Sequence, residues 1–133
     1  MLWEEKNAIY KHTVRCSSLQ CIDLKKIRSK KFKVVVDAVN GAGALALPTM
    51  LDMLGCEVIK LDCEPNGVFN RGTEPLPENL KILSQNVIQN NADVGFAVDP
   101  DVYRLALVDE NGPPLGEEYS LVLAADGYIN FLK

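Results

Sequence analysis

The sequence predicts an α/β fold, namely a three-layer α/β/α domain on a four-stranded mixed sheet with three parallel strands and one antiparallel edge strand. Two observations predict this fold. Short β-branched runs alternate with amphipathic stretches of helical length, which is the pattern of successive strand–helix–strand units. A fourth strand-like run then follows the third after too few residues for a helical crossover, so it is expected to pair antiparallel.

Length and composition are those of one ordinary globular domain. The 133 residues are 47% hydrophobic and 24% charged, and a chain of this size can bury a real core. The net charge of −4 argues against nucleic acid or an anionic membrane as the main partner. No apolar run reaches the ~20 residues of a membrane span, and no signal-peptide layout is present, so a cytoplasmic location is expected. The four cysteines form no CxxC pair and are expected to remain reduced thiols.

Residues 1–31 are expected to form an N-terminal arm or linker, and residues 32–133 the domain itself. Within the arm, Asp23 is placed to cap a short helix that runs to Ile27. Five lysines and arginines gather at positions 25–31. They are interpreted as a solvated face, because the interleaved aromatic residues of a nucleic-acid patch are missing.

The domain begins with a strand and a glycine-rich turn. Residues 32–36 form a β-branched run too short for a helix, which predicts a buried strand. Residues 37–43 read DAVNGAG, which suits either backbone N–H groups presented to a phosphate or a tight strand-to-helix turn. The spacing is neither GxGxxG nor a P-loop, so both interpretations stay open. Residues 44–54 then predict a helix with one apolar face, and Gly55 is placed to end it.

A second strand and helix follow. Residues 56–61 predict a strand parallel to the first, joined by a right-handed crossover. Residues 62–77 form a long loop, and loops of this length within a compact domain are commonly functional or mobile. Arg71 and Glu74 are its candidate polar residues, with an exposed structural loop as the alternative. Residues 78–91 predict the next helix.

The last part of the chain supplies two strands and a helix. Residues 92–98 predict the third parallel strand, and residues 105–108 predict the antiparallel edge strand. An Asn-Gly turn ends this strand. Residues 116–132 predict a final helix, in which Gly127 is expected to weaken the last third.

An acidic turn after the third strand carries the candidate chemistry. Asp99 and Asp101 are separated by one residue, so their carboxylates can converge on one small volume. Such oxygen ligands suit Mg²⁺, with water or substrate phosphate completing its shell. Arg104 adds a cationic fork suited to phosphate. Because ligands of open α/β sheets bind at the carboxyl ends of the strands, the turn predicts a metal and phosphate site for phosphoryl chemistry.

This turn also has three other interpretations. An EF-hand would need glycine where Arg104 stands, and helices where the flanks predict strands. A phosphatase resembling the haloacid-dehalogenase family would use Asp99 as its nucleophile, although in that family the DxD motif follows the first strand. A plain surface turn would use its carboxylates only to accept hydrogen bonds from backbone N–H groups.

Four segments of the sequence are informative in combination, namely DAVNGAG (37–43), EPLPENL (74–80), DPDVYRLALVDENG (99–112) and GEEYSLVLAAD (116–126). Together they resemble the α-D-phosphohexomutase superfamily, which contains phosphoglucomutase, phosphomannomutase and phosphoglucosamine mutase. Their order and spacing match the second of that family's domains. Residues 1–31 would then be the tail of a preceding domain that this chain lacks.

The resemblance implies an isomerase that interconverts hexose 1- and 6-phosphates by intramolecular phosphotransfer, through a phosphoserine and a bisphosphate intermediate. The second domain of such enzymes supplies the metal loop DxDxDR. Asp99 and Asp101 would then be Mg²⁺ ligands, and Arg104 would contact the phosphoryl group. Tyr103 occupies the place of the expected third Asp and offers no carboxylate, so weak Mg²⁺ binding is expected.

The catalytic serine loop, the sugar-reading loop and the phosphate clamp of that family lie in its other domains. No catalytic residue is therefore assigned to this chain, which is expected to be inactive as an isolated fragment. In the full-length enzyme its partners would be the hexose phosphate and the other domains. The alternatives are a non-catalytic docking or self-association module with a degraded metal site, and a small Mg²⁺-dependent phosphatase.

Overall fold

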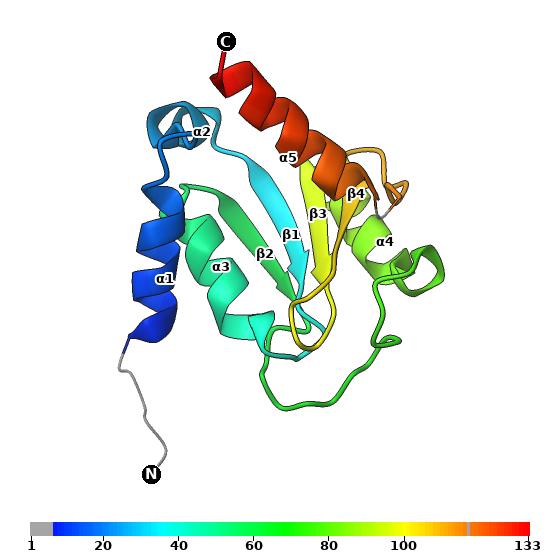
Figure 1. Cartoon of the computed structure of the whole chain (residues 1–133). Coiled ribbons are helices and arrows are strands. Elements are labelled where there is room, and N and C mark those ends of the chain that lie inside the picture. Colours follow the sequence, from blue (N-terminus) through cyan, green and yellow to red (C-terminus); the bar gives the residue numbers. More distant parts are fainter. Residues whose placement is uncertain (1–6, 117) are drawn as a thin grey trace.

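The computed structural model describes residues 7–116 and 118–133, which form an α/β fold around one mixed sheet (Figure 1). The strand order across the sheet is β2-β1-β3-β4. β1 pairs in parallel with both β2 and β3, whereas β4 pairs antiparallel with β3. The predicted fold class is therefore confirmed. The strands are β1 (Lys33–Asp37), β2 (Glu57–Leu61), β3 (Val94–Val98) and β4 (Leu105–Asp109).

Helices cover both faces of this sheet (Figure 1). α3 covers one face over β1 and β2, and α4 covers the opposite face. α5 lies on the same side as α3, over β4. None of the helices in the described ranges has the length and apolarity that crossing a membrane would require. The helices are α1 (Ala8–Ser17), α2 (Leu24–Lys30), α3 (Gly43–Met53), the short 3₁₀ helix η1 (Pro77–Asn79), α4 (Lys81–Gln89) and α5 (Glu118–Phe131).

The N-terminal arm packs onto the domain, because α1 lies against α3. Asp23 caps α2 as predicted, since its Oδ1 accepts the backbone N–H of Lys26 at 2.9 Å. The Arg28 guanidinium donates two hydrogen bonds to the carbonyl oxygen of Met53, at 3.1 and 2.8 Å. The end of α3 is therefore tied to the arm.

The core consists of two apolar layers, one on each side of β1. Val35 packs with Leu83 and Val87 of α4, and all three side chains are fully buried. Val34 and Val36 point the other way and pack under α3. This alternation follows the two-residue period of a strand. Because β1 is anchored on both faces, the loops at its carboxyl end start from a fixed support.

Two predicted helices differ in detail from the observed ones. The helix predicted over residues 78–91 is divided into η1 and α4 at Leu80, whose backbone leaves helical geometry (φ −98°, ψ 8°) while its side chain is buried. Burial of Leu80 in the core and the preceding Pro77 explain the division, because the α-helix starts only after the chain has turned inward. Gly127 does not interrupt α5, which continues to Phe131.

Candidate functional site

The acidic loop of residues 99–104 lies at the carboxyl end of β3, as predicted (Figure 1). Asp99 is buried, with 8% of its surface exposed. Its Oδ1 accepts the backbone N–H of Arg104 at 2.8 Å, and its carbonyl oxygen accepts the N–H of Val102 at 3.1 Å. One carboxylate oxygen of Asp99 therefore closes the loop, while Oδ2 takes no part in that closure.

Two further positions of this loop face solvent. Asp101 is exposed, and Tyr103 is 87% exposed. Within residues 7–116 and 118–133, no group of three or more His, Cys, Asp or Glu side chains could hold a metal ion. Mg²⁺ in proteins often takes only one or two carboxylates and keeps several waters. The predicted ligands Asp99 and Asp101 are thus chemically compatible with a weakly held ion, and their role stays a prediction.

Arg104 points from the acidic loop toward the long loop. Its Nη1 lies 3.1 Å from Oε2 of Glu74, and the two side chains are 44% and 52% exposed. Exposed ion pairs of this kind contribute only about 0–1 kcal/mol to stability. A phosphate group can therefore replace the Glu74 carboxylate at little cost, and the predicted phosphate-binding role of Arg104 is compatible with its position.

Arg71 joins three parts of the site, a role that the sequence did not reveal. Its Nε donates to Oδ2 of Asp37 at 2.6 Å, and these side chains are 6% and 3% exposed. Its Nη2 donates to the carbonyl oxygen of Val98 at 2.8 Å, directly before Asp99. The long loop is therefore tied to the ends of β1 and β3. The available signal was Asp37 itself, because a carboxylate ending an apolar strand requires a partner.

The glycine-rich turn after β1 supports the acidic loop. The N–H of Ala42 donates to the carbonyl oxygen of Pro100 at 2.8 Å. A Cβ atom on Gly41 would lie 2.6 Å from the Cα of Pro100, so only glycine permits this close approach. The N–H of Asn40 donates to the carbonyl oxygen of Asp62 at 2.6 Å. These N–H groups are used within the protein, which favours the tight-turn interpretation over a phosphate cradle.

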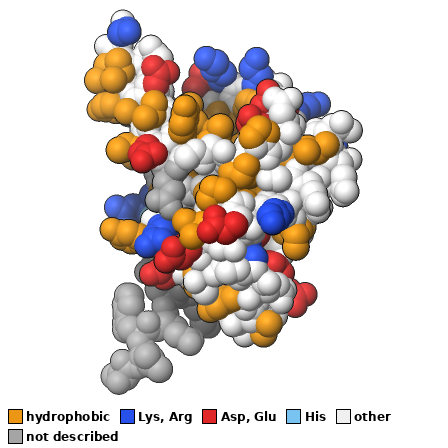
Figure 2. All heavy atoms as spheres, turned by 90° about the vertical axis from the view of Figure 1, so that its right-hand side faces the viewer, with side chains coloured by type: hydrophobic (Ala, Val, Ile, Leu, Met, Phe, Trp, Pro, Cys, Tyr) orange, Lys and Arg blue, Asp and Glu red, His pale blue; other side chains and the backbone are white. Residues whose placement is uncertain are grey.

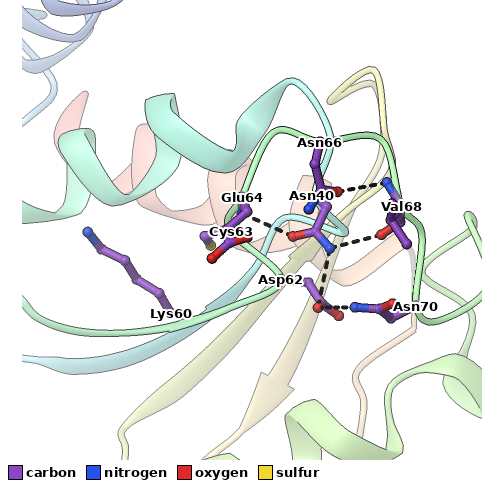
Figure 3. A pocket seen from close by; sticks show the side chains of 8 residues that line it. All are labelled: Asn40, Lys60, Asp62, Cys63, Glu64, Asn66, Val68 and Asn70. Atoms are coloured by element: carbon purple, nitrogen blue, oxygen red, sulfur yellow. Dashed lines mark hydrogen bonds between the residues drawn. The ribbon is translucent and has the colours of Figure 1, made fainter.

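A polar pocket of about 620 Å³ lies beside this turn, at the ends of β1 and β2 (Figure 3). Asn40 is at its centre, where Oδ1 accepts the N–H of Glu64 at 3.0 Å and Nδ2 donates to the carbonyl oxygen of Val68 at 2.8 Å. Nδ2 of Asn70 donates to Oδ1 of Asp62 at 2.7 Å. Figure 3 shows these side chains directed toward one another. They anchor the long loop to the edge of the sheet.

All four cysteines lie in the described ranges and are free thiols. Burial raises the pKa of the Cys63 thiol, whose Sγ donates to the carbonyl oxygen of Leu61 at 3.2 Å. Burial likewise raises the pKa of Cys56. Both thiols therefore stay protonated at neutral pH, in which form they are poor nucleophiles and poor metal ligands.

The sequence matches a family described as phosphoglucomutase/phosphomannomutase, alpha/beta/alpha domain II, over residues 11–112. The chain belongs to this family. The resemblance inferred from the four segments is therefore confirmed. The domain II match begins within α1 and ends after β4, before α5 starts. The predicted domain boundary at residue 32 stays a prediction, since the match begins inside the predicted arm.

Individual relatives agree with this assignment. A phosphoglucomutase/phosphomannomutase of Thermococcus kodakarensis is 39% identical over 109 residues, which cover 81% of this chain and 24% of the relative. A probable phosphoglucosamine mutase of Pyrococcus horikoshii is 39% identical over 128 residues, covering 96% and 28% of the two chains. A crystal structure of a family protein from Burkholderia thailandensis matches with a TM-score of 0.76 at 26% identity, covering 92% and 26%. This chain spans about a quarter of the length of these relatives.

Proposed function

We propose that this chain is the metal-loop domain of a phosphohexomutase and that it has no mutase activity by itself. One observation carries the proposal. In a chain that matches domain II of this family, the acidic loop lies at the carboxyl end of β3 and is closed by a hydrogen bond to the buried Asp99. The relatives are named phosphoglucomutase/phosphomannomutase and phosphoglucosamine mutase. Interconversion of hexose 1- and 6-phosphates is therefore the activity proposed for the longer protein, with the phosphoserine on another domain.

In this proposal three residues of the acidic loop bind ligands, and Arg71 of the long loop supports them. Asp99 and Asp101 would hold Mg²⁺ together with water. The bound ion would withdraw negative charge from the transferring phosphoryl group. Arg104 binds the transferring phosphoryl group, which replaces the Glu74 carboxylate as the partner of its guanidinium. Arg71 reaches the loop only through the backbone of Val98, so it positions the site and does not touch the substrate.

Replacing Tyr103 with aspartate is expected to raise the affinity for Mg²⁺ by at least about tenfold, or about 1.4 kcal/mol. The substitution adds a third carboxylate to the loop at a side chain that is 87% exposed and therefore free to reorient. Titration calorimetry with Mg²⁺ at constant ionic strength measures the effect. Tyr103→Asn is the matched control, because asparagine has the shape of aspartate without its charge. Equal affinities for the two variants would contradict the metal-loop role.

The isolated chain is expected to show no turnover of glucose, mannose or glucosamine phosphates, even with a bisphosphate activator. The acidic loop supplies no nucleophile for phosphoryl transfer in this proposal, and positioning by several domains is what accelerates such reactions. Coupled isomerisation assays test this expectation, with the Thermococcus relative as the positive control for glucose and mannose phosphates and the Pyrococcus relative for glucosamine phosphates. Robust turnover by the isolated chain would overturn the claim that it is inactive alone.

A chimaera tests the metal-loop role through an expected increase in mutase activity. Residues 11–112 of this chain replace the matching segment of the Thermococcus relative, to which this chain is 39% identical. The chimaera with Tyr103→Asp is expected to be more active than the chimaera that keeps Tyr103, at equal amounts of folded protein. If both chimaeras turned over at the same rate, residue 103 would have no part in the metal loop.

A second candidate function is a non-catalytic docking or self-association module. α5 favours it, because none of the residues described in this helix is buried. A helix of largely apolar composition that packs this little on its own domain is expected to contact something else. This function does not depend on Mg²⁺ or on the acidic loop.

The geometry of Asp99 does not favour a small Mg²⁺-dependent phosphatase. A nucleophilic carboxylate must reach the phosphorus atom of its substrate. Asp99 is buried, and its Oδ1 already accepts the hydrogen bond from Arg104 that closes the loop. If the chain hydrolysed phosphate esters, Asp99→Asn would be expected to abolish that activity. Hydrolysis that persisted in this variant would exclude Asp99 as the nucleophile.

A further inference from the structure

Val102 stands between Asp101 and Tyr103 in a backbone conformation that valine rarely adopts. Its φ is +61°, in the left-handed region. Its N–H donates to the carbonyl oxygen of Asp99 at 3.1 Å, so a tight turn ends at this residue. Glycine and asparagine are the usual residues in this conformation, because a β-branched side chain is in steric conflict with its own backbone there. The surrounding structure must therefore hold Val102 in place.

Left-handed residues other than glycine gather at the carboxyl edge of the sheet. Seven of them occur within the described ranges, and four stand in the turns that follow β1, β2 and β3. Costly backbone conformations persist mainly where function requires a fixed geometry. The four residues are Val39, Asn40, Asp62 and Val102, of which Val102 belongs to the acidic loop.

The side chain of Val102 rests on the first residue of α3. Gly43 begins this helix and is buried. A Cβ atom on Gly43 would lie 3.2 Å from Cγ2 of Val102 and 3.2 Å from Cγ2 of Val98. It would also lie 3.3 Å from Cδ1 of Leu47. These three side chains therefore meet over the bare Cα of the glycine, where the acidic loop passes the start of α3 (Figure 1).

Exposure alone does not distinguish Val102 from other apolar residues. Figure 2 shows hydrophobic side chains scattered among charged ones over one face of the molecule, and such scattered exposure is normal. Val102, which is 41% exposed, is distinguished by a strained backbone together with a methyl group that contacts Gly43. Both residues lie within the segment 11–112 that matches the family.

We propose that Val102 is a positioning residue, whose contact with Gly43 sets the direction of the side chains at positions 101 and 103. These positions precede and follow the left-handed residue, so a change in its backbone angles turns them relative to each other. Asp99 is held separately, because its Oδ1 accepts the N–H of Arg104. The role of Val102 in Mg²⁺ binding rests on the proposed function, and the contact between Val102 and Gly43 does not.

Gly43→Ala is expected to displace the acidic loop. The new Cβ requires its neighbours to move by a few tenths of an ångström. Val98 is 2% exposed within β3, whereas Val102 belongs to a loop, so Val102 is the neighbour that moves. Amide chemical shifts of residues 99–104 in the full chain report this displacement. With Tyr103→Asp also present, the affinity for Mg²⁺ is expected to fall about tenfold.

A second substitution is expected to reverse this loss. Val102→Ala alone should lower the affinity for Mg²⁺ to a similar degree, because it removes the methyl group that rests on Gly43. In the double variant Gly43→Ala/Val102→Ala, the new Cβ at position 43 takes the place of that methyl group. The affinity is then expected to return to within about twofold of the Tyr103→Asp parent, whereas independent losses would multiply.

Gly127→Ala is the control for adding a methyl group, because nothing lies within 4 Å of a Cβ built on Gly127. It is expected to leave the Mg²⁺ affinity and the amide shifts of residues 99–104 unchanged. Circular dichroism confirms that each variant is folded.

The outcomes separate the positioning role from the proposed function. Losses that multiply in the double variant, or an unchanged affinity in Val102→Ala, would overturn the positioning role. The second of these results does not depend on Gly43→Ala being folded. If the amide shifts recovered in the double variant while the Tyr103→Asp parent bound no Mg²⁺, the metal-loop function would fail, and the role of Val102 in Mg²⁺ binding would fail with it. The contact between Val102 and Gly43 would still stand.

Discussion

Replacing Arg71 with alanine is expected to destabilise the fold by about 3–5 kcal/mol, because the buried Asp37 carboxylate loses its partner. The carbonyl oxygen of Val98, directly before Asp99, loses a donor as well. Domains of this kind have a total stability of about 5–15 kcal/mol, so the loss is a large fraction of it. Urea unfolding at pH 7 measures the change in the free energy of unfolding.

Arg104→Ala is the matched control for this experiment. The Arg104–Glu74 pair is 44% and 52% exposed, so its loss is expected to cost at most about 1 kcal/mol. Adding Asp37→Asn to Arg71→Ala is expected to recover part of the stability, because the unpaired buried charge is then removed. Equal losses in Arg71→Ala and Arg104→Ala would show that the buried pair does not hold the loops together.

Replacing Gly41 with alanine is expected to cost about 1–3 kcal/mol and to displace the acidic loop. The new Cβ would lie 2.6 Å from both the Cα and the carbonyl oxygen of Pro100, and these backbone atoms cannot rotate away. The neighbouring hydrogen bond from Ala42 to Pro100 would be strained or lost. Urea unfolding measures the free energy, and amide chemical shifts of residues 99–104 report the displacement.

Gly127→Ala is the control for the Gly41 variant. No atom lies within 4 Å of a Cβ built on Gly127, which stands inside α5. This change is expected to stabilise the chain by up to about 1 kcal/mol, because alanine is the better helix former. In the Tyr103→Asp background, Gly41→Ala should also lower the Mg²⁺ affinity, whereas Gly127→Ala should not. A Gly41 variant as stable as the Gly127 variant would refute the close contact.

The acidic loop keeps its shape without any contribution from residue 103. Asp99 closes the loop on the backbone of Arg104, and Pro100 binds the glycine-rich turn through Ala42. Neither hydrogen bond involves Tyr103, whose side chain faces solvent. Loss of the third carboxylate is therefore expected to weaken the metal site without unfolding the loop that carries it. Because the shape of the loop does not depend on residue 103, the Tyr103→Asp variant tests metal binding without changing the fold of the loop.

The sequence by itself determined the order of the elements, the α/β class and the place of the acidic loop. β-branched runs and amphipathic stretches are local patterns, and a short connection permits only antiparallel pairing. Parallel strands end at one edge of a sheet, so the position of Asp99, Asp101 and Arg104 followed from the strand order. The combination of four segments was specific enough to indicate the family.

Only the tertiary structure decided how the loops hold one another and how little α5 is buried. Arg71 and Asp37 are 34 positions apart, and no local pattern indicates that their side chains meet. The need for glycine at position 41 depends on the backbone of Pro100, which belongs to another loop. α5 is apolar over much of its circumference, which by itself predicts a buried helix, whereas none of its described residues is buried. Such features depend on contacts between distant segments, and these exist only once the chain has folded.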